Sequence, residues 1–328
     1  MAILKKPTVN LGDDGAPLVI RCEKVGPRKS AIWDSTLGYP GEGPGAPTTF
    51  KIATQNMNGS LTGNAWNLLL REARALKIDL LFVQEHNLKS EDKRLETMRN
   101  CTLAHGFSYC HIACVPQCVG RGGTATLISD RVEVNNATSF DRCGGNMTVT
   151  NFELKKIKLR AVNVYAPQQE LDPKGVPLET RRDHYYNKLK KHVTKSTILG
   201  GDFQNVLDVS LDLRRTANSA YENGGAEILR TIISENELED EIRNGLGLGF
   251  DFTRCETVTS RGVTNTCQSR IDRIYHCIHQ NLQWTSEILP IGEVCESDHA
   301  MVTLKMEIIE DSPETDTKKN SSLWTRSY

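Results

Sequence analysis

The sequence lacks long hydrophobic runs and any recognisable secretory leader. No stretch reaches the roughly 18 consecutive apolar residues that a membrane-spanning helix requires. The N-terminal segment MAILKKPTVNLGDDGAP contains no apolar core followed by a small-residue cleavage site. We therefore expect an intracellular protein with no membrane partner, and nothing in the sequence indicates an obligatory protein partner.

The sequence also lacks an excess of charge of either sign. It contains 40 Lys and Arg against 41 Asp and Glu, which gives a formal net charge of −1. A protein that held nucleic acid mainly by neutralising phosphates would carry a clear positive excess. The basic clusters are local, at residues 155–160, 181–191 and 214–215. The charge balance therefore excludes a basic nucleic-acid wrapper but does not identify a substrate.

The cysteines lack the paired spacing of a zinc site. Ten cysteines are scattered through the chain, and without a secretory leader they are expected to be reduced thiols. The densest group is Cys110, Cys114 and Cys118, with His111 between the first two, and no matching pair follows downstream. Ordinary strand and loop cysteines are the favoured interpretation, with zinc binding as the alternative.

The composition divides the chain into three parts. Residues 38–47 are dense in Gly and Pro and cannot sustain a helix or a sheet, so residues 1–48 are predicted to be a poorly ordered N-terminal extension. Residues 310–328 are polar, lack periodicity and are predicted to be a C-terminal tail. Residues 49–309 between them are predicted to form a single α/β domain.

Short β-rich runs alternate with longer amphipathic segments in this central part. Apolar residues at spacings of three and four predict helices over residues 64–77, 179–193 and 226–234. Strands are predicted over residues 50–55, 80–84, 123–129, 147–154, 159–165, 196–199, 271–275 and 301–306. The mixture of βα and ββ connections favours packed sheets flanked by helices over a purely parallel, doubly wound sheet.

Polar residues gather where the predicted strands end, which is where α/β proteins tend to place their sites. A single carboxylate at a strand end is most often a turn former, and Asn-x-Asn-Gly is common turn chemistry. The set is more informative than its members. It comprises Asn56, Asn58, Glu85, Tyr165, Asp202, Asp272, Asp298 and His299.

This set suits the hydrolysis of a phosphodiester. The reaction needs a cation on the phosphoryl oxygens, an activated water and help for the leaving oxygen. Glu85, Asp202 and Asp298 offer the hard oxygen ligands that Mg²⁺ prefers. His299 follows Asp298 and has a second candidate partner in Asp272, which could fix its tautomer. The residues therefore predict metal-assisted phosphoryl chemistry.

The ordered segments QNMNG, QEH, NVYAP, GGDFQN, SRIDRIY and SDH resemble the endonuclease/exonuclease/phosphatase superfamily over about residues 50–308. Within it, the chain is most similar to the endonuclease domains of non-LTR (LINE-type) retrotransposons. The resemblance implies a DNase I-like α/β fold, a four-layer sandwich of two packed mixed β-sheets flanked by helices. It also implies an Mg²⁺-dependent endonuclease that nicks duplex DNA, with Mn²⁺ as an alternative metal and the nucleus as its location.

The resemblance also assigns roles to individual positions. The implied catalytic residues are Tyr165, Asp202, Asp272 and His299. The implied metal-binding residues are Asn56, Glu85 and Asp298. The implied substrate-binding or phosphate-binding residues are Asn58, Gln204, Asn205, Thr253 and Ser297.

Two residues depart from the family pattern. The family usually reads Gly-Asp-Phe-Asn, whereas Gln204 stands in the Asn place and Asn205 follows it. The extra methylene changes the reach of the amide by roughly 1 Å or more unless the loop adjusts. We expect activity to survive through a shifted Asn205 or an adapted Gln204, below the family level. Arg254 stands where related repair enzymes often carry a Trp that grips an abasic sugar, which disfavours a dedicated abasic-site enzyme.

Other functions remain open at this point. The same phosphoryl machinery could act on abasic or adducted DNA, an inositol phosphate or a lipid, because loops decide the substrate. An inactive remnant that only binds nucleic acid is a third interpretation. A retrotransposon polyprotein would continue into a reverse transcriptase, so the chain could be a fragment, a reused gene or a free-standing nuclease.

Overall fold

A computed structural model of the chain describes most of the central part of the sequence. The segments predicted to be an extension and a tail, like Cys118, lie outside the described residues. The described residues are 49–59, 63–117, 120–154, 157–168, 177–216, 223–246, 252–260, 263–277 and 282–308. No helix within these ranges is long and apolar enough to cross a membrane.

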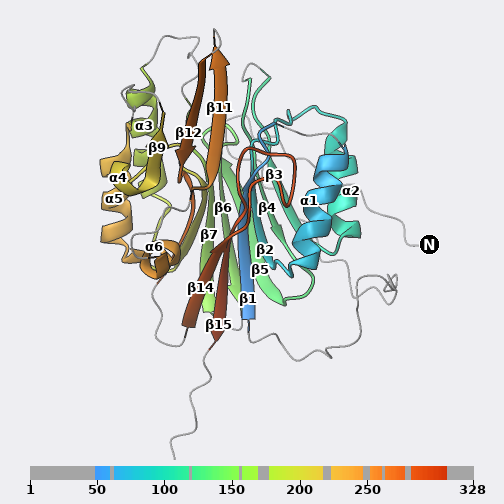
Figure 1. Cartoon of the computed structure of the whole chain (residues 1–328). Coiled ribbons are helices and arrows are strands. Elements are labelled where there is room, and N and C mark those ends of the chain that lie inside the picture. Colours follow the sequence, from blue (N-terminus) through green and yellow to red (C-terminus); the bar gives the residue numbers. More distant parts are fainter. Residues whose placement is uncertain are drawn as a thin grey trace, which may run out of the picture.

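Two six-stranded sheets pack face to face at the centre of the structure (Figure 1). The first has the order β14-β15-β1-β2-β4-β3, and its one parallel pair joins β1 and β2. Its strands are β1 (Thr49–Asn56), β2 (Leu80–Gln84), β3 (Tyr109–Ala113), β4 (Thr124–Ile128), β14 (Leu282–Ile288) and β15 (Val302–Ile308).

The second sheet has the order β10-β13-β8-β7-β6-β5, with a parallel pair of β7 and β8. Its other strand pairs are antiparallel, so this sheet is also mixed. Its strands are β5 (Val134–Arg142), β6 (Met147–Leu154), β7 (Ile157–Tyr165), β8 (Thr197–Asp202), β10 (Leu238–Glu239) and β13 (Asp272–Cys277).

A third, small sheet extends beyond one end of the two large sheets (Figure 1). It consists of the hairpin β11 (Arg254–Ser260) and β12 (Val263–Ser269) with β9 (Leu213–Arg215) along the edge of β12.

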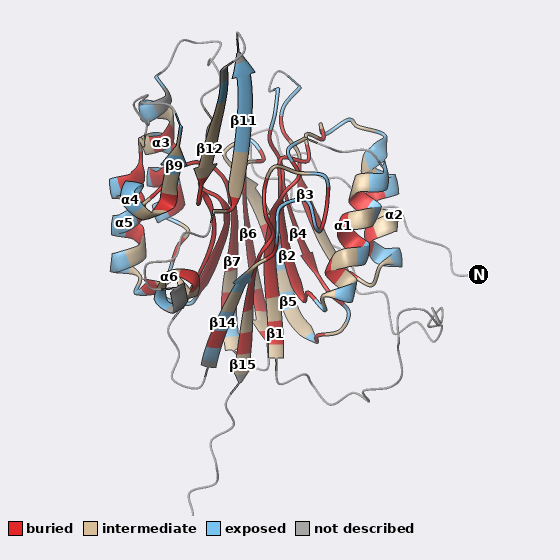
Figure 2. Ribbon diagram, in the orientation of Figure 1, coloured by how far each residue is buried: buried red, intermediate tan, exposed pale blue. Residues whose placement is uncertain are grey.

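Helices cover the outer faces of the two large sheets. Figure 1 shows α1 and α2 beside the first sheet, and α3, α4, α5 and α6 on the opposite side. The faces of the helices turned toward the sheets are buried and the opposite faces are exposed (Figure 2). Their bounds are α1 (Gly63–Ala75), α2 (Arg94–Ala104), α3 (Leu178–Lys190), α4 (Val209–Asp212), α5 (Ala226–Glu235) and α6 (Glu241–Leu246).

The alternation of side chains along β2 explains the layering. Leu80 and Phe82 belong to the core that includes the facing strands of the second sheet. Leu81 and Val83 pack on the other side, in the cluster that holds the buried stripe of α1. Successive side chains of a strand point to opposite faces, so a strand with helices on one face and a sheet on the other is apolar throughout. The predicted fold class, a four-layer α/β sandwich, is confirmed.

Candidate active site

Parallel pairing in the first sheet places Asn56 next to Glu85. Asn56 is the last residue of β1 and lies opposite Gln84, the last residue of β2. Glu85 follows with a φ of 56°, a left-handed conformation that non-glycine residues adopt rarely and often at functional sites. Its side chain is only 1% exposed. The two residues predicted to bind metal therefore lie at the same edge of this sheet.

Three predicted catalytic residues lie side by side in the second sheet. Tyr165 ends β7 opposite Asp202, which ends β8, and Asp272 begins β13 opposite Asp202 on the other side. The chain reaches Asp202 through Gly201, whose φ is 136°. A side chain at Gly201 would collide with the backbone oxygen of Val164. Glycine at this position therefore allows β8 to approach β7 closely just before Asp202.

The segment before β15 brings Asp298 and His299 to the same place. The Ser297 hydroxyl donates to the backbone oxygen of Asn56 at 2.8 Å and accepts from the His299 backbone N–H at 3.1 Å. The Gln55 amide donates to the His299 carbonyl at 3.2 Å. These bonds attach the segment to the end of β1.

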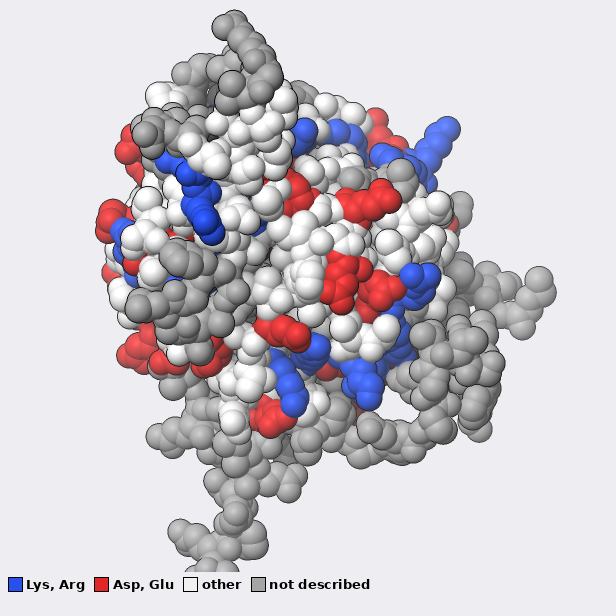
Figure 3. Space-filling model, viewed as in Figure 1, with Lys and Arg blue, Asp and Glu red and all other residues white. Residues whose placement is uncertain are grey.

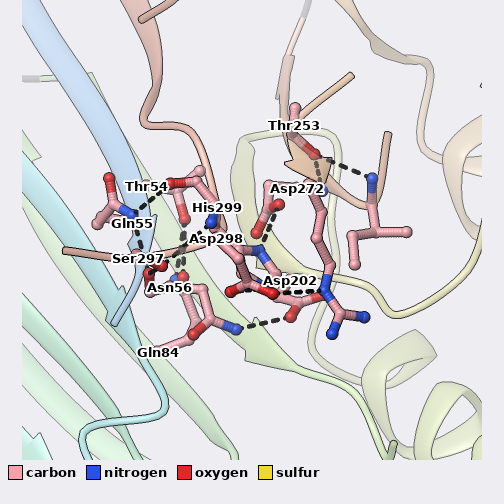
Figure 4. A network of polar contacts seen from close by, with 12 residues as sticks. Thr54, Gln55, Asn56, Gln84, Asp202, Thr253, Asp272, Ser297, Asp298 and His299 are labelled. Carbon is pink, nitrogen blue, oxygen red and sulfur yellow. Dashed lines mark hydrogen bonds and ion pairs between the residues drawn. The ribbon is translucent and has the colours of Figure 1, made fainter. Parts of the chain in front are cut away.

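Two hydrogen-bonded pairs join the two sheets at this point (Figure 4). Asn56 Nδ2 donates to Asp202 Oδ2 at 2.8 Å. His299 Nδ1 lies 2.8 Å from Asp272 Oδ2, with 2% of the His299 side chain and 1% of the Asp272 side chain exposed. A carboxylate on one ring nitrogen fixes the imidazole and leaves Nε2 for a second partner. The site is thus assembled from both sheets.

The His299 ring is held in its protonated form. Burial opposes the charge on the ring, but the charge and hydrogen bond of Asp272 outweigh that effect, with help from the charges of Asp202 and Asp298. Together they raise the pKa of His299 to about 9. The imidazolium can therefore donate from Nε2 at neutral pH.

At Asp202, burial and a neighbouring negative charge together raise the pKa of the carboxyl group. Its side chain is fully buried, and burial, together with the charge of Asp272, raises its pKa to about 7 although the charge of His299 lowers it. Its Oδ1 accepts from the Gln204 backbone N–H at 2.9 Å. A carboxyl group with a pKa near neutrality can accept and release a proton, which suits a general acid or base.

The environment of Glu85 fits a divalent cation. Arg121 Nη1 lies 3.3 Å and Gln168 Nε2 lies 3.4 Å from its two oxygens, and the Tyr165 hydroxyl is a further polar neighbour. A buried carboxylate needs closer compensation than this. The Asn56 side-chain oxygen accepts one bond, from the Asn58 N–H at 2.7 Å, and retains a lone pair. A carboxylate and an amide oxygen are a donor set that Mg²⁺ and Mn²⁺ accept.

Burial raises the pKa of the Tyr165 hydroxyl, and the charges of Glu85 and Asp202 raise it further. The phenol therefore stays protonated beside these carboxylates and can donate a hydrogen bond to a negatively charged group.

Within the described residues, two groups of three carboxylate or His ligand atoms converge. One is Asp202, Asp272 and His299, and the other is Glu239, Glu241 and His276 at the far end of β13. Neither group includes Asp298, Cys110 or Cys114. The alternative of a zinc site at the cysteine triplet therefore receives no support from the two described cysteines.

The Gly-Asp-Phe-Gln loop accommodates its unusual residue. Gln204 has a φ of 52°, and its side-chain amide donates to Asp202 Oδ2, so the longer side chain folds back onto the carboxylate of Asp202. Asn205 is fully buried. Neither its amide oxygen nor its amide nitrogen has a hydrogen-bond partner among the described residues. Gln204 is thus engaged with Asp202, whereas the amide of Asn205 is unpaired among the described residues, and both alternatives for the phosphate contact stay predictions.

Asp298 has a partner that the sequence did not predict. Its Oδ2 lies 3.2 Å from Arg254 Nε, and its Oδ1 lies 3.7 Å from His299 Nε2. Arg254 begins β11 at the base of the projecting hairpin, and its backbone forms an isolated bridge with His299. The predicted metal ligand thus lies between two cationic side chains.

Three predicted substrate contacts have other surroundings. Thr253 is fully buried, and its hydroxyl accepts from the backbone N–H groups of Ile271 and Asp272 at 3.1 and 3.0 Å. Thr253 thus supports the start of β13, and its contact with DNA stays a prediction. Ser297 shapes the turn before His299, as described above. Asn58 is exposed beside Asn56 and remains available to a ligand.

Sequence reasoning missed the buried polar layer beneath these residues. Gln84 Nε2 donates to Asn163 Oδ1 at 2.7 Å and to the Thr54 hydroxyl at 2.9 Å. Asn163 in turn donates to the backbone oxygen of Ala125 at 2.8 Å. The bonds of Asn163 cross from one sheet to the other just below the site. The signal was present as polar residues inside otherwise apolar strands.

No family model matches the sequence, and no curated protein matches it. Solved structures do match. An AP endonuclease from Leishmania major has a TM-score of 0.59 at 15% identity, over 79% of this chain and 88% of that one. An AP endonuclease from Archaeoglobus fulgidus has a TM-score of 0.55 at 16% identity, over 78% and 98%. A 3′-5′ exonuclease from Neisseria meningitidis has a TM-score of 0.55 at 18% identity, over 80% and 100%.

Proposed function

We propose that this chain, which has the DNase I-like fold of the endonuclease/exonuclease/phosphatase superfamily, is a metal-dependent phosphodiesterase that nicks duplex DNA. The observation that carries the proposal is the junction of the two sheets, where Asn56 holds Asp202 and Asp272 holds His299. In this proposal, Asp202 transfers a proton beside the imidazolium of His299, and Glu85 binds the cation. A decayed remnant would be under no pressure to keep these interactions together.

His299 acts on the phosphate. Its Nδ1 is occupied by Asp272, so the Nε2 proton is the one directed to a substrate oxygen. Negative charge grows on the phosphoryl oxygens as the bond to the attacking water forms, and a hydrogen bond from a cationic donor becomes stronger as it does. Asp272 positions the ring and keeps it protonated.

Asp202 transfers the proton in the reaction. With a pKa of about 7, it can take the proton from the attacking water or return one to the leaving 3′-oxygen. The Asn56 and Gln204 amides both donate to its Oδ2, which directs the carboxyl group and limits its rotation.

Glu85 and Asn56 would hold the metal, Mg²⁺ or Mn²⁺, with Asn56 using its amide oxygen. When bound there, the metal supplies positive charge that offsets the charge of the phosphoryl oxygens. Tyr165 stays protonated and donates to the phosphate. Asn58, exposed beside Asn56, is a further candidate contact to the substrate.

The substrate we propose is an intact DNA duplex, nicked in the manner of retrotransposon endonucleases to leave a 3′-hydroxyl, which implies work in the nucleus. The order of the sequence segments supports this choice, and structural neighbours described as AP endonucleases and a 3′-5′ exonuclease support DNA as the class of substrate. Arg254, at the Trp place of abasic-site enzymes, favours an intact strand over an abasic one.

Duplex oligonucleotides of one sequence test the substrate. We expect cleavage of the intact duplex at least as fast as that of a duplex with an abasic-site analogue or a 5′-tyrosyl end, and no phosphate release from an inositol polyphosphate. Much faster cleavage of the abasic or adducted duplex would assign the chain to repair. Hydrolysis of the inositol phosphate alone would remove DNA as the substrate.

A further inference from the structure

Exposure rises from the junction of the sheets toward one side of the site. The side chains of Asp272 and His299 are 1% and 2% exposed, whereas those of Asp298 and Arg254 are 24% and 25% exposed. Asp298 and Arg254 therefore form the solvent-facing rim of the site next to His299.

The guanidinium of Arg254 has unused donors. It has five N–H groups, and its Nε is directed at Asp298 Oδ2, 3.2 Å away. Its other ion pair among the described residues joins Nη2 to Glu256 Oε2 at 3.5 Å, a long contact with a half-exposed carboxylate. Within the described residues, Nη1 and Nη2 of Arg254 are not among the buried atoms that lack a hydrogen-bond partner. The described residues thus hold the Nε side and leave the Nη side of the guanidinium for an external acceptor.

We propose that Arg254 binds a phosphate of the DNA strand and that Asp298 positions it, rather than serving as a metal ligand. The inference rests on the proposed function. Asp298 connects Arg254 to His299, because its second oxygen lies 3.7 Å from His299 Nε2. A phosphate that accepts from Nε2 is therefore within reach of the Nη donors, and a planar guanidinium suits two oxygens of one phosphate.

The same contacts argue against a metal at Asp298. Asp298 Oδ2 is paired with the Arg254 guanidinium, whose charge would repel a divalent cation placed there. Asp298 Oδ1 has no hydrogen-bond partner among the described residues and lies 3.7 Å from His299 Nε2. Among the described residues, Glu85 has one cationic partner within 4 Å, Arg121 at 3.3 Å. The metal is therefore expected at Glu85, with Arg254 supplying positive charge on the opposite side.

DNA binding without cleavage tests the phosphate contact. Fluorescence anisotropy of a labelled duplex in EDTA, over a series of KCl concentrations, is compared for wild type, Arg254→Ala, Arg254→Lys and Asp298→Asn. Arg71→Ala is the matched control, since Arg71 also pairs with a carboxylate but lies on α1 in the outer layer. Circular dichroism melting checks that each variant is folded.

Loss of one phosphate contact should weaken binding at low salt by roughly tenfold. It should also reduce the salt slope, the slope of the logarithm of the binding constant against the logarithm of the KCl concentration, by about 0.9. We expect this from Arg254→Ala, while Arg254→Lys keeps the slope, Asp298→Asn weakens binding less, and Arg71→Ala changes neither quantity. A merely structural role would lower affinity without changing the slope. An unchanged slope for folded Arg254→Ala therefore overturns the inference while leaving the proposed function intact.

Metal binding is measured separately, by calorimetric titration of Mn²⁺ into DNA-free protein. Glu85→Gln should abolish the binding, whereas Asp298→Asn and Arg254→Ala should keep it within about threefold of wild type. Loss of Mn²⁺ binding in Asp298→Asn, equal to that in Glu85→Gln, contradicts the assignment of Asp298. If wild type neither binds DNA in EDTA nor nicks it with Mg²⁺, the proposed function fails and the role of Arg254 fails with it.

Discussion

The pair of Asp272 and His299 shows how one hydrogen bond controls a buried imidazole. Burial lowers the pKa of His299, but the charge and the 2.8 Å hydrogen bond of Asp272, with the charges of Asp202 and Asp298, raise it to about 9. Asp272→Asn keeps the shape but removes the charge, so the ring should lose its proton near neutrality and its fixed orientation. We expect kcat to fall by about 10² to 10⁴-fold with little change in KM. A pH titration of the His299 ring by NMR should show the pKa lowered, and an unchanged pKa would contradict this role.

The same pair makes stability depend on pH in a defined direction. The pKa of His299 in the folded protein, about 9, lies above its ordinary value of 6.5. The folded state therefore binds the proton more tightly, and the stabilisation is fully present below pH 6.5 and lost as pH rises through about 9. In EDTA, the Tm of wild type should decrease as the pH rises from 6.5 to about 9. In Asp272→Asn the decrease should be smaller. An equal dependence of Tm on pH in the two proteins would contradict this role of the pair.

Gln204 offers a test of the loop that departs from the family. Its amide is directed at Asp202 and its backbone is left-handed at a φ of 52°, a conformation that Asn tolerates better. Gln204→Asn should therefore free an amide for the phosphate and increase kcat several-fold, by on the order of 1 kcal/mol. Single-turnover cleavage of a duplex measures this, with Gln204→Ala as the control that lacks any amide. A rate equal to that of wild type rejects the idea of reduced activity.

At the scale of elements, the approach of β8 to β7 determines where Asp202 lies. Gly201 has a φ of 136° and no room for a side chain against the backbone of Val164. Gly201→Ala should lower the free energy of unfolding by about 2 kcal/mol or more and reduce activity by displacing Asp202. Urea unfolding measures the first effect. Gly63→Ala, at the first position of α1 where a Cβ meets nothing within 4 Å, should be neutral or stabilising.

Elements with a strong apolar pattern were predicted from the sequence, and those held by pairing were not. The strands β1, β2, β6 and β7 and the helix α1 lie close to their predicted ranges, because each buries a regular apolar face. The hairpin of β11 and β12 and the edge strand β5 were missed. Their residues are largely polar, and partners distant in the sequence hold them in place, so local pattern carries little information about them.

The positions of the site residues followed the same rule. Asn56, Asp202 and His299 were predicted as site residues because they lie at the ends of predicted strands. The structure brings them together. Their partners could not be predicted. Arg254 and Asp298 are 44 residues apart, and Gln84 and Asn163 are 79 apart. Only the packing of the two sheets and the hairpin makes these contacts.

At the scale of the whole molecule, the site belongs to neither sheet alone. The first sheet provides Glu85 and His299, the second provides Asp202 and Asp272, and the hydrogen bonds between them cross the interface of the sandwich. Acidic and basic side chains are interspersed on the face shown in Figure 3, in keeping with the net charge of −1. DNA binding is therefore expected to depend on a few placed cations and to weaken steeply as salt is added.

The most direct test of the central claim is the nicking of supercoiled plasmid by the purified chain, with Mg²⁺ or EDTA, and with His299→Ala in parallel. We expect wild type to relax the plasmid with Mg²⁺ only. The rate of nicking should fall by at least about 10²-fold in the variant. Equal inactivity of folded wild type and His299→Ala, in Mg²⁺ and in Mn²⁺, would contradict it. Equal activity of the two proteins would contradict it as well.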